Sequence, residues 1–192
     1  ETPVQRPQYM ARGDTPGQIT GLGVKGNGVG VILPVQIIAL PLAQAPGAPL
    51  LMTGAAAETM QASGLNVIEA LRGRAERHPS DFTYSTPLSE LRLHIHLPPL
   101  KEDKDGPSAG AAMAVGALSE ITQRQVNPAL ALTGGLLPSG QLFAVGGISE
   151  KIQAARTEGK SLIFIPSGNE TDLHTYLEGQ NPGSEPVAIV SA

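Results

Sequence analysis

The serine at position 108 lies where the sequence favours nucleophilic chemistry. The segment Asp105–Gly110 reads Asp-Gly-Pro-Ser-Ala-Gly, and it joins a polar loop to a run of small, helix-forming residues. Ser108 is therefore expected in the first turn of a helix, where unpaired backbone N–H groups point to the same side. Such donors stabilise the oxyanion of an acyl-transfer reaction. The simpler alternative is that Ser108 only caps the helix, a common role for serine.

A serine nucleophile needs a base, and Lys151 is the candidate. It follows Gly146-Gly147 and falls in the first turn of a predicted helix, where a cation is disfavoured by up to about 1 kcal/mol. To be neutral near pH 7 its pKa must fall by about three units from ~10.4, which corresponds to roughly 4 kcal/mol. Only burial supplies that much, and the neighbours Ile148 and Ile152 are compatible with burial. The alternative is an ordinary solvated lysine.

The composition argues against several other kinds of chemistry. The 192 residues include no cysteine and no tryptophan, and 3% are aromatic; thiol chemistry is excluded and stacking platforms for bases are disfavoured. A net charge of −4 gives no sign of a nucleic-acid-binding surface. No run of about 18 apolar residues occurs, so no membrane segment is expected in this chain. The start at Glu1, without a leader-like segment, favours a piece of a longer protein.

The elements that must position these two residues begin with a hairpin. Residues 1–15 are rich in proline and are expected to form an extended lead-in to a domain at 16–192. Two β-rich runs follow at 19–24 and 29–42, and Gly26-Asn27-Gly28 between them indicates a hairpin turn. Pro34 and Pro41 predict that the second run is an edge strand or is broken.

The rest of the chain mixes helical and extended patterns. Apolar residues recur at helical spacing from about 56 to 78, whereas 91–97 alternates strictly, as in a half-buried strand. This mixture of hairpins and crossovers predicts an α+β domain in two layers. The other predicted elements are helices at 108–123, 149–158 and 170–177 and strands at 50–53, 129–133, 141–145, 161–165 and 187–190.

Two segments closely resemble the active-site signatures of Lon-type proteases, which cut peptide bonds with a Ser-Lys dyad. They are Lys104–Gly110 and Gly146–Ala155, and their Ser108 and Lys151 stand 43 positions apart, as is usual in that family. The resemblance implies that Ser108 is the nucleophile and Lys151 the general base.

Supporting roles follow from the same resemblance. Ala131-Leu132-Thr133-Gly134 is similar to the family's strand ending in Thr-Gly, which implies that Thr133 bonds the lysine amine and holds it toward the serine. Asp105, with Gly106 and Pro107, would support the serine by supplying backbone to the oxyanion site or by gating the lysine with its carboxylate.

His94 and His96 share one face of the predicted strand at 91–97. By the resemblance this strand borders the active-site cleft, so the two histidines are expected to line the cleft. Two histidines on one strand could also bind zinc, but a third ligand at a recognisable spacing is missing.

The resemblance runs from about residue 16 to 178 and implies an architecture and an activity. The fold would be the family's two-layer α+β domain, of the ribosomal protein S5 domain 2-like kind. The domain would be a serine endopeptidase that cleaves unfolded or damaged polypeptides in protein quality control, within a larger, cytoplasmic, homo-hexameric protein. No cofactor or metal is expected in this domain; ATP and Mg would be needed only if the parent protein carries an ATPase module.

The sequence also departs from the family pattern. Gly135 stands where most relatives have an acidic or hydroxyl residue, and Pro138 is unusual in its stretch. The run Gly30–Pro34 is more similar to the archaeal, membrane-type branch, whereas the Ser108 motif is more similar to the bacterial branch. The subfamily, and with it ATP dependence, is therefore left open.

Three other interpretations remain to be weighed. Gly21–Gly26 satisfies the G-x-G-x-x-G pattern of dinucleotide-binding folds, but no helix is predicted after it. Gly106–Ala111 could be a phosphate-binding loop of a small-molecule kinase with a related fold, although the hydroxyl-rich run favoured there is missing. The chain could also be an inactive protease-like scaffold kept for assembly.

Overall fold

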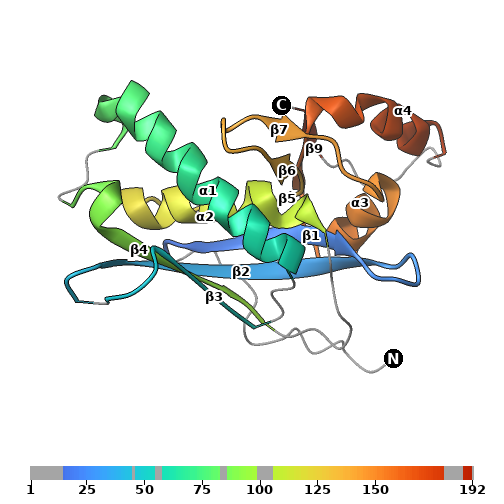
Figure 1. Cartoon of the computed structure of the whole chain (residues 1–192). Helices are drawn as coiled ribbons and strands as arrows, with labels where there is room; N and C mark the ends of the chain where they lie inside the picture. The colour runs from blue at the N-terminus through green and yellow to red at the C-terminus, as the bar shows by residue number, and fades with distance from the viewer. Residues whose placement is uncertain are drawn as a thin grey trace.

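The fold is built on a seven-stranded mixed sheet with helices packed against it (Figure 1). The computed structural model describes residues 15–44, 46–54, 58–82, 86–98, 106–179 and 188–191. The sheet order is β3-β4-β2-β1-β5-β8-β9, and β6 and β7 form a separate hairpin. The strands are β1 (Gln18–Val24), β2 (Gly30–Pro41), β3 (Leu50–Gly54), β4 (Leu91–Leu97), β5 (Leu130–Leu132), β6 (Gly135–Leu136), β7 (Leu142–Phe143), β8 (Leu162–Ile165) and β9 (Ala188–Ser191). The helices are α1 (Glu58–Arg77), α2 (Gly110–Thr122), α3 (Ile148–Thr157) and α4 (Glu170–Glu178), with short 3-10 turns at Pro79–Asp81, Leu88–Glu90, Pro107–Ala109 (η3) and Ser167–Asn169 (η4).

The predicted mixed α+β fold is confirmed. β2 pairs antiparallel with β1 and β4, whereas β1–β5, β3–β4, β5–β8 and β8–β9 are parallel pairs. Parallel neighbours need crossover connections; α1 lies in the connection from β3 to β4, and α3 lies in the connection from β5 to β8. The predicted elements appear with their ends displaced by a few residues, and β4 has the predicted bounds. The lead-in before residue 15 lies outside the described residues.

The first hairpin is confirmed, but the prediction that its second run is an edge strand or is broken is wrong, because β2 is continuous and lies between β1 and β4. Gly28 has a φ of 81° and donates its N–H to the Lys25 carbonyl oxygen at 2.9 Å. β2 is continuous because its two halves have different neighbours: residues 30–36 pair with β1, and residues 36–41 pair with β4. Pro34 therefore has a partner strand on one side only, and Pro41 is the last residue of the strand. Neither proline removes a backbone hydrogen bond that the sheet would otherwise make.

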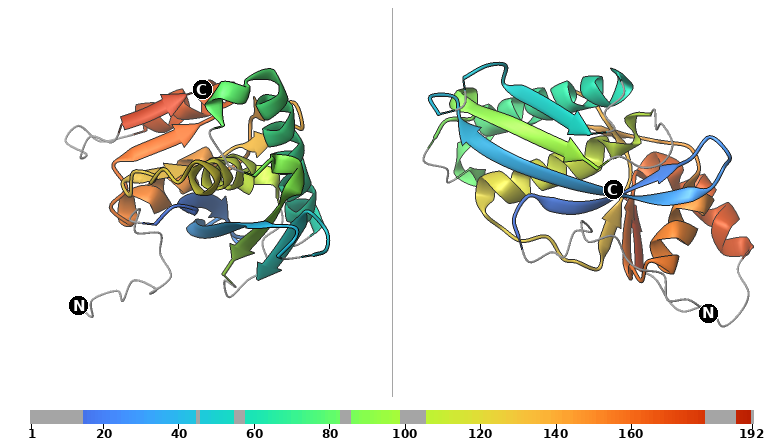
Figure 2. Two further views of the ribbon diagram at one scale, coloured as in Figure 1. Left: turned by 90° about the vertical axis from the view of Figure 1, so that its left-hand side faces the viewer. Right: turned by 90° about the horizontal axis from the view of Figure 1, so that it is seen from below.

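One face of the sheet is covered by α1 and α2, which lie above β2, β3 and β4 in Figure 1. The alternation in β4 directs its leucines and Ile95 into this core. Seen from below in Figure 2, the three strands lie in front of the two helices, and no helix of the described chain covers their other face. The buried members of this first core include Ile19, Val35, Ile37, Val67, Ile95, Met113 and Ile121.

Helices α3 and α4 pack on the opposite face of β1, β5 and β8. Leu132 belongs to the first core, whereas the preceding residue, Ala131, belongs to a second core with α3 and α4. Because successive strand residues point to opposite faces, the region around β5 has helices on both sides. This adds a layer to the two that were expected. The second core contains Leu22, Ala131, Ile148, Ile152, Ala155, Ile163, Ile165 and Tyr176.

The start of β2 lies directly against the first turn of α3. A Cβ atom on Gly30 would come within 1.9 Å of the Glu150 carbonyl oxygen, whereas a Cβ atom on Gly26 would meet nothing within 4 Å. Only glycine at position 30 lets the strand approach the helix backbone this closely.

Gly30→Ala should therefore lower the free energy of unfolding by about 1–3 kcal/mol, because the strand and the helix must move apart. Gly26→Ala, in the same hairpin, serves as the matched control and should change the free energy by less than about 0.5 kcal/mol. Urea denaturation measures both. Equal stability of the two variants would contradict the close approach.

Candidate active site

Ser108 lies in the 3-10 turn η3, directly before α2. The N-cap positions of η3 and α2 are Gly106 and Ala109, so the structure does not give Ser108 the capping role considered from the sequence. Gly106 has a φ of 155°, a conformation that favours glycine, and Pro107 begins the turn. The Ser108 residue is half-buried, and no hydrogen bond from its N–H group to another described residue is present.

The backbone of Ser108 is tied to the end of β5. Its carbonyl oxygen accepts the Gly134 N–H at 3.0 Å and the Thr133 hydroxyl at 3.3 Å. The Ala111 N–H in turn donates to the Gly134 carbonyl oxygen at 3.0 Å. Three bonds thus fix the start of α2 against Thr133-Gly134, and the serine cannot shift without breaking them.

Thr133 is buried between the serine turn and β1. Its residue is 1% exposed, and its hydroxyl also lies 3.5 Å from the Leu22 carbonyl oxygen. Successive residues of a strand point to opposite faces of the sheet. Thr133 directly follows Leu132 at the end of β5, so it points to the opposite face, which α3 covers. No hydrogen bond between Thr133 and Lys151 occurs among the described residues, although the Thr133 oxygen keeps lone pairs that could accept one.

Lys151 lies in the middle of the buried stripe of α3. The stripe is Ile148, Lys151, Ile152 and Ala155, and the lysine residue is only 3% exposed. Burial lowers the pKa of Lys151 from 10.5 to about 8, against a smaller raising effect of the Glu150 carboxylate. A lysine with a pKa of about 8 is about one-tenth neutral at pH 7 and can act as a base.

The serine and the lysine approach the end of β5 from the two faces of the sheet. The turn with Ser108 leads into α2 on one face, and α3 with Lys151 covers the other. Thr133, at the end of the strand, contacts the Ser108 backbone and points toward the α3 face. The Ser108 hydroxyl and the Lys151 amine are not hydrogen-bonded to each other in the described part of the chain.

His94 and His96 form a hydrogen-bonded cluster with Thr53 of β3. The Thr53 hydroxyl lies 2.8 Å from His94 Nε2 and 2.8 Å from His96 Nδ1. Both histidines are half-buried on the sheet face opposite α1 and α2. Burial, followed by His96 and Arg92, lowers the pKa of His94. The cluster ties β3 to β4 near the C-terminal ends of both strands.

The departures from the family pattern have local structural reasons. A Cβ atom on Gly135 would lie 2.1 Å from the Phe143 ring, which occupies the space that a side chain would need. Pro138 is the second residue of a turn closed by the Gly140 N–H on the Leu137 carbonyl oxygen at 2.9 Å, a position that proline favours. Asp105 lies outside the described residues.

Asn169 was not predicted from the sequence. It is 2% exposed and stands at the N-cap of α4, yet its side chain makes no capping bond. Two of its hydrogen bonds go to Val145, shortly before α3 and far along the chain, so no local pattern could have revealed those contacts.

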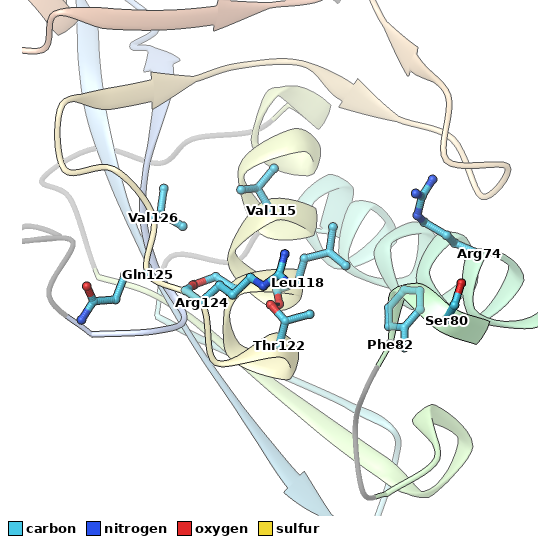
Figure 3. Close-up of a pocket in the computed structure, with 10 residues that line it drawn as sticks. Arg74, Ser80, Phe82, Val115, Leu118, Thr122, Arg124, Gln125 and Val126 are labelled. Atoms are coloured by element: carbon cyan, nitrogen blue, oxygen red, sulfur yellow. Dashed lines mark hydrogen bonds between the residues drawn. The ribbon is translucent and has the colours of Figure 1, made fainter. Parts of the chain in front are cut away.

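The described residues offer few alternatives to this site. No group of three or more potential metal-ligating residues occurs among them, and none of their helices is long and apolar enough to cross a membrane. A cavity of about 620 Å³ lies at the other end of α2 from Ser108, between Val115, Leu118 and Thr122 on that helix and Phe82 beyond α1 (Figure 3).

The burial of Lys151 should appear in the pH dependence of stability. Between pH 8 and pH 10.5 the unfolded chain binds more protons than the folded one, so the free energy of unfolding rises with pH across this window. Lys151→Met removes the ammonium and should be more stable than the wild type at pH 7 by up to about 3 kcal/mol.

That difference should shrink toward zero by about pH 10.5, where the lysine is neutral in both states. Urea denaturation of both proteins from pH 7 to pH 10.5 measures it. Subtracting the two curves cancels the titration of the other groups. A difference that does not change with pH would rule out burial of the charged amine as its cause.

Comparison with known proteins identifies the family. Residues 2–179 match the family model of the Lon protease C-terminal proteolytic domain. The chain is 34% identical over 167 residues to a Lon protease of Salinispora arenicola and 35% identical over 168 residues to a mitochondrial Lon protease homolog of Ostreococcus lucimarinus. It is 32% identical over 166 residues to the peroxisomal Lon protease homolog 2 of Eremothecium gossypii.

These matches cover 84–88% of this chain but 16–20% of the three relatives, so the chain spans a fifth or less of their length. The match to a peptidase family does not support the small-molecule kinase or the dinucleotide-binding fold considered from the sequence. The chain belongs to the family of Lon protease C-terminal proteolytic domains.

Proposed function

We propose that the domain is a serine endopeptidase in which Ser108 is the nucleophile and Lys151 the general base. The observation that carries the proposal is the burial of Lys151, at 3% exposure, in the apolar stripe of α3. A structural lysine avoids such a position because the charged form loses its hydration. A catalytic base benefits from such a position, because the same loss of hydration lowers the pKa and lets the amine be neutral near pH 8.

In the first half of the reaction, the neutral Lys151 Nζ takes the proton of the Ser108 hydroxyl as Oγ attacks the peptide carbonyl carbon. The carbonyl π bond opens and leaves a negative charge on the oxygen. The Ser108 N–H group, which has no partner among the described residues, is our candidate donor to this oxyanion. Thr133 would orient the amine with the free lone pairs of its hydroxyl.

In the second half, the Lys151 ammonium gives its proton to the departing amine, the C–N bond breaks, and an ester to Ser108 remains. Water, deprotonated by the neutral amine, then attacks the ester carbon. The bond between that carbon and Ser108 Oγ breaks, Oγ takes the proton back from the Lys151 ammonium, and the new carboxyl end of the peptide is released. Every proton is carried by Lys151, so we propose no cofactor or metal for this chemistry.

The remaining parts of the proposal concern the longer protein. We propose that the substrates are unfolded polypeptides, because an extended chain can reach a serine at the start of a helix and a folded one cannot. Assembly into six copies, a role in protein quality control and a cytoplasmic location stay predictions. Among the relatives, one is named as peroxisomal and one as mitochondrial.

Cleavage of casein or of a fluorogenic peptide tests the dyad directly. Ser108→Ala and Lys151→Met should each lower kcat by at least about a thousandfold, because the nucleophile and the base act together and each variant removes one of them. In the wild type, kcat/KM should rise about tenfold between pH 7 and pH 9, since the neutral fraction of a lysine with a pKa of about 8 rises by that factor.

Lys160→Met is the matched control, because it removes a lysine whose amine bonds the Pro128 carbonyl oxygen, outside the site. It should keep wild-type activity. Activity that survives Lys151→Met would eliminate the proposed base, and a biological function kept in full by Ser108→Ala would favour the inactive scaffold.

A further inference from the structure

A buried asparagine from another part of the chain bonds Val145, shortly before α3 begins. Asn169, the last residue of η4, is 2% exposed and is one of the largest fully buried side chains of the described chain. A buried amide costs free energy unless its donors and acceptor are all paired. Its burial is therefore favourable only if it makes specific contacts.

Those contacts use the whole amide. Asn169 Oδ1 accepts the Val145 N–H at 3.0 Å, and Asn169 Nδ2 donates to the Val145 carbonyl oxygen at 2.9 Å. The second Nδ2 proton goes to the Asp172 carboxylate at 2.6 Å. Rotating the amide by 180° would place its oxygen against two other oxygens, so the network permits one orientation only.

Two glycines and the first turn of α3 connect Val145 to Lys151. Gly146 and Gly147 follow Val145, and Gly147 is the N-cap of α3, with a φ of 69°. The Gly147 carbonyl oxygen accepts the Lys151 backbone N–H at 3.0 Å. A glycine pair has many accessible conformations, so the position of this turn depends on what fixes the chain on either side of it.

On one side, the first turn of α3 lies against β2, as the contact of Gly30 with Glu150 shows. On the other side, the two bonds of Asn169 fix both polar backbone groups of Val145, as a neighbouring strand would. We propose that Asn169 is a positioning residue for the reaction, and that its hold on Val145 keeps α3 oriented with Lys151 buried at the active site.

The inference rests on the proposed function, since it concerns the residue that we propose as the base. Burial of the amine is unfavourable, so a loosened helix start would let the amine turn toward water. The lysine would then be charged over a wider pH range and aimed less well at Ser108. The effect should fall on the chemical step, whereas no contact of Asn169 suggests a direct role in binding substrate.

The test compares three variants of the 192-residue chain. Asn169→Ala removes both bonds to Val145. Asn169→Asp keeps the shape and the acceptor for the Val145 N–H, but it cannot donate to the Val145 carbonyl oxygen. Asp172→Asn is the matched control, because it leaves the pairing of Asn169 with Val145 intact and still offers an acceptor to Asn169 Nδ2.

In both Asn169 variants kcat should fall at least tenfold with KM changed less than about twofold, and the rising limb of the pH profile should move to higher pH. Asp172→Asn should stay within about twofold of the wild type in both constants. Unchanged kcat and pH profile in folded Asn169→Asp would overturn the proposal, even if Asn169→Ala does not fold.

An NMR titration of the Lys151 side chain gives a readout that does not need activity. The pKa of Lys151 should rise from about 8 in the Asn169 variants and stay unchanged in Asp172→Asn. If the wild type cleaves nothing, the proposed function fails, but this titration still decides the role of Asn169. An unchanged Lys151 pKa in Asn169→Asp would show that Asn169 does not position the lysine.

Discussion

The burial of one lysine amine is the constraint on which the rest of the site depends. Lys151 takes a place in α3 that the spacing of Ile148, Ile152 and Ala155 assigns to an apolar side chain. An ammonium there has lost most of its water, which disfavours the charged form. The fold therefore holds a group that would be more stable in solvent. This unfavourable position also makes the amine a usable base near pH 8.

Holding such a group requires rigid surroundings, and β5 provides the link between the two sides of the site. Its neighbours in the sheet are β1 and β8, through the pairs Gly21–Leu132 and Leu132–Phe164. The strand end then fixes the Ser108 backbone through Thr133 and Gly134. On the other face, α3 lies against β2, and the Asn169 side chain bonds Val145 shortly before the helix begins. Serine and lysine thus belong to different layers that share one strand.

Local patterns predicted much of the fold, and contacts between distant segments account for what they missed. The strict alternation of 91–97 predicted β4 with its bounds, because one face of that strand is buried and the other is not. The continuity of β2 could not be predicted, since Pro34 is tolerated only because β2 changes neighbours at residue 36. The Ser108 and Lys151 motifs could be found by type and spacing. The bonds from Thr133 to the serine backbone and from Asn169 to Val145 depend on crossovers that no local pattern encodes.

The central claim is that a buried, neutral Lys151 activates Ser108. The most direct measurement is the rate at which a serine-reactive peptide electrophile modifies the protein, with the modified residue located by mass spectrometry from pH 6 to pH 10. The account predicts modification at Ser108, a rate that rises about tenfold from pH 7 to pH 9, and loss of the reaction in Lys151→Met. Modification of Ser108 at a rate that is independent of pH, or that persists without Lys151, would contradict it.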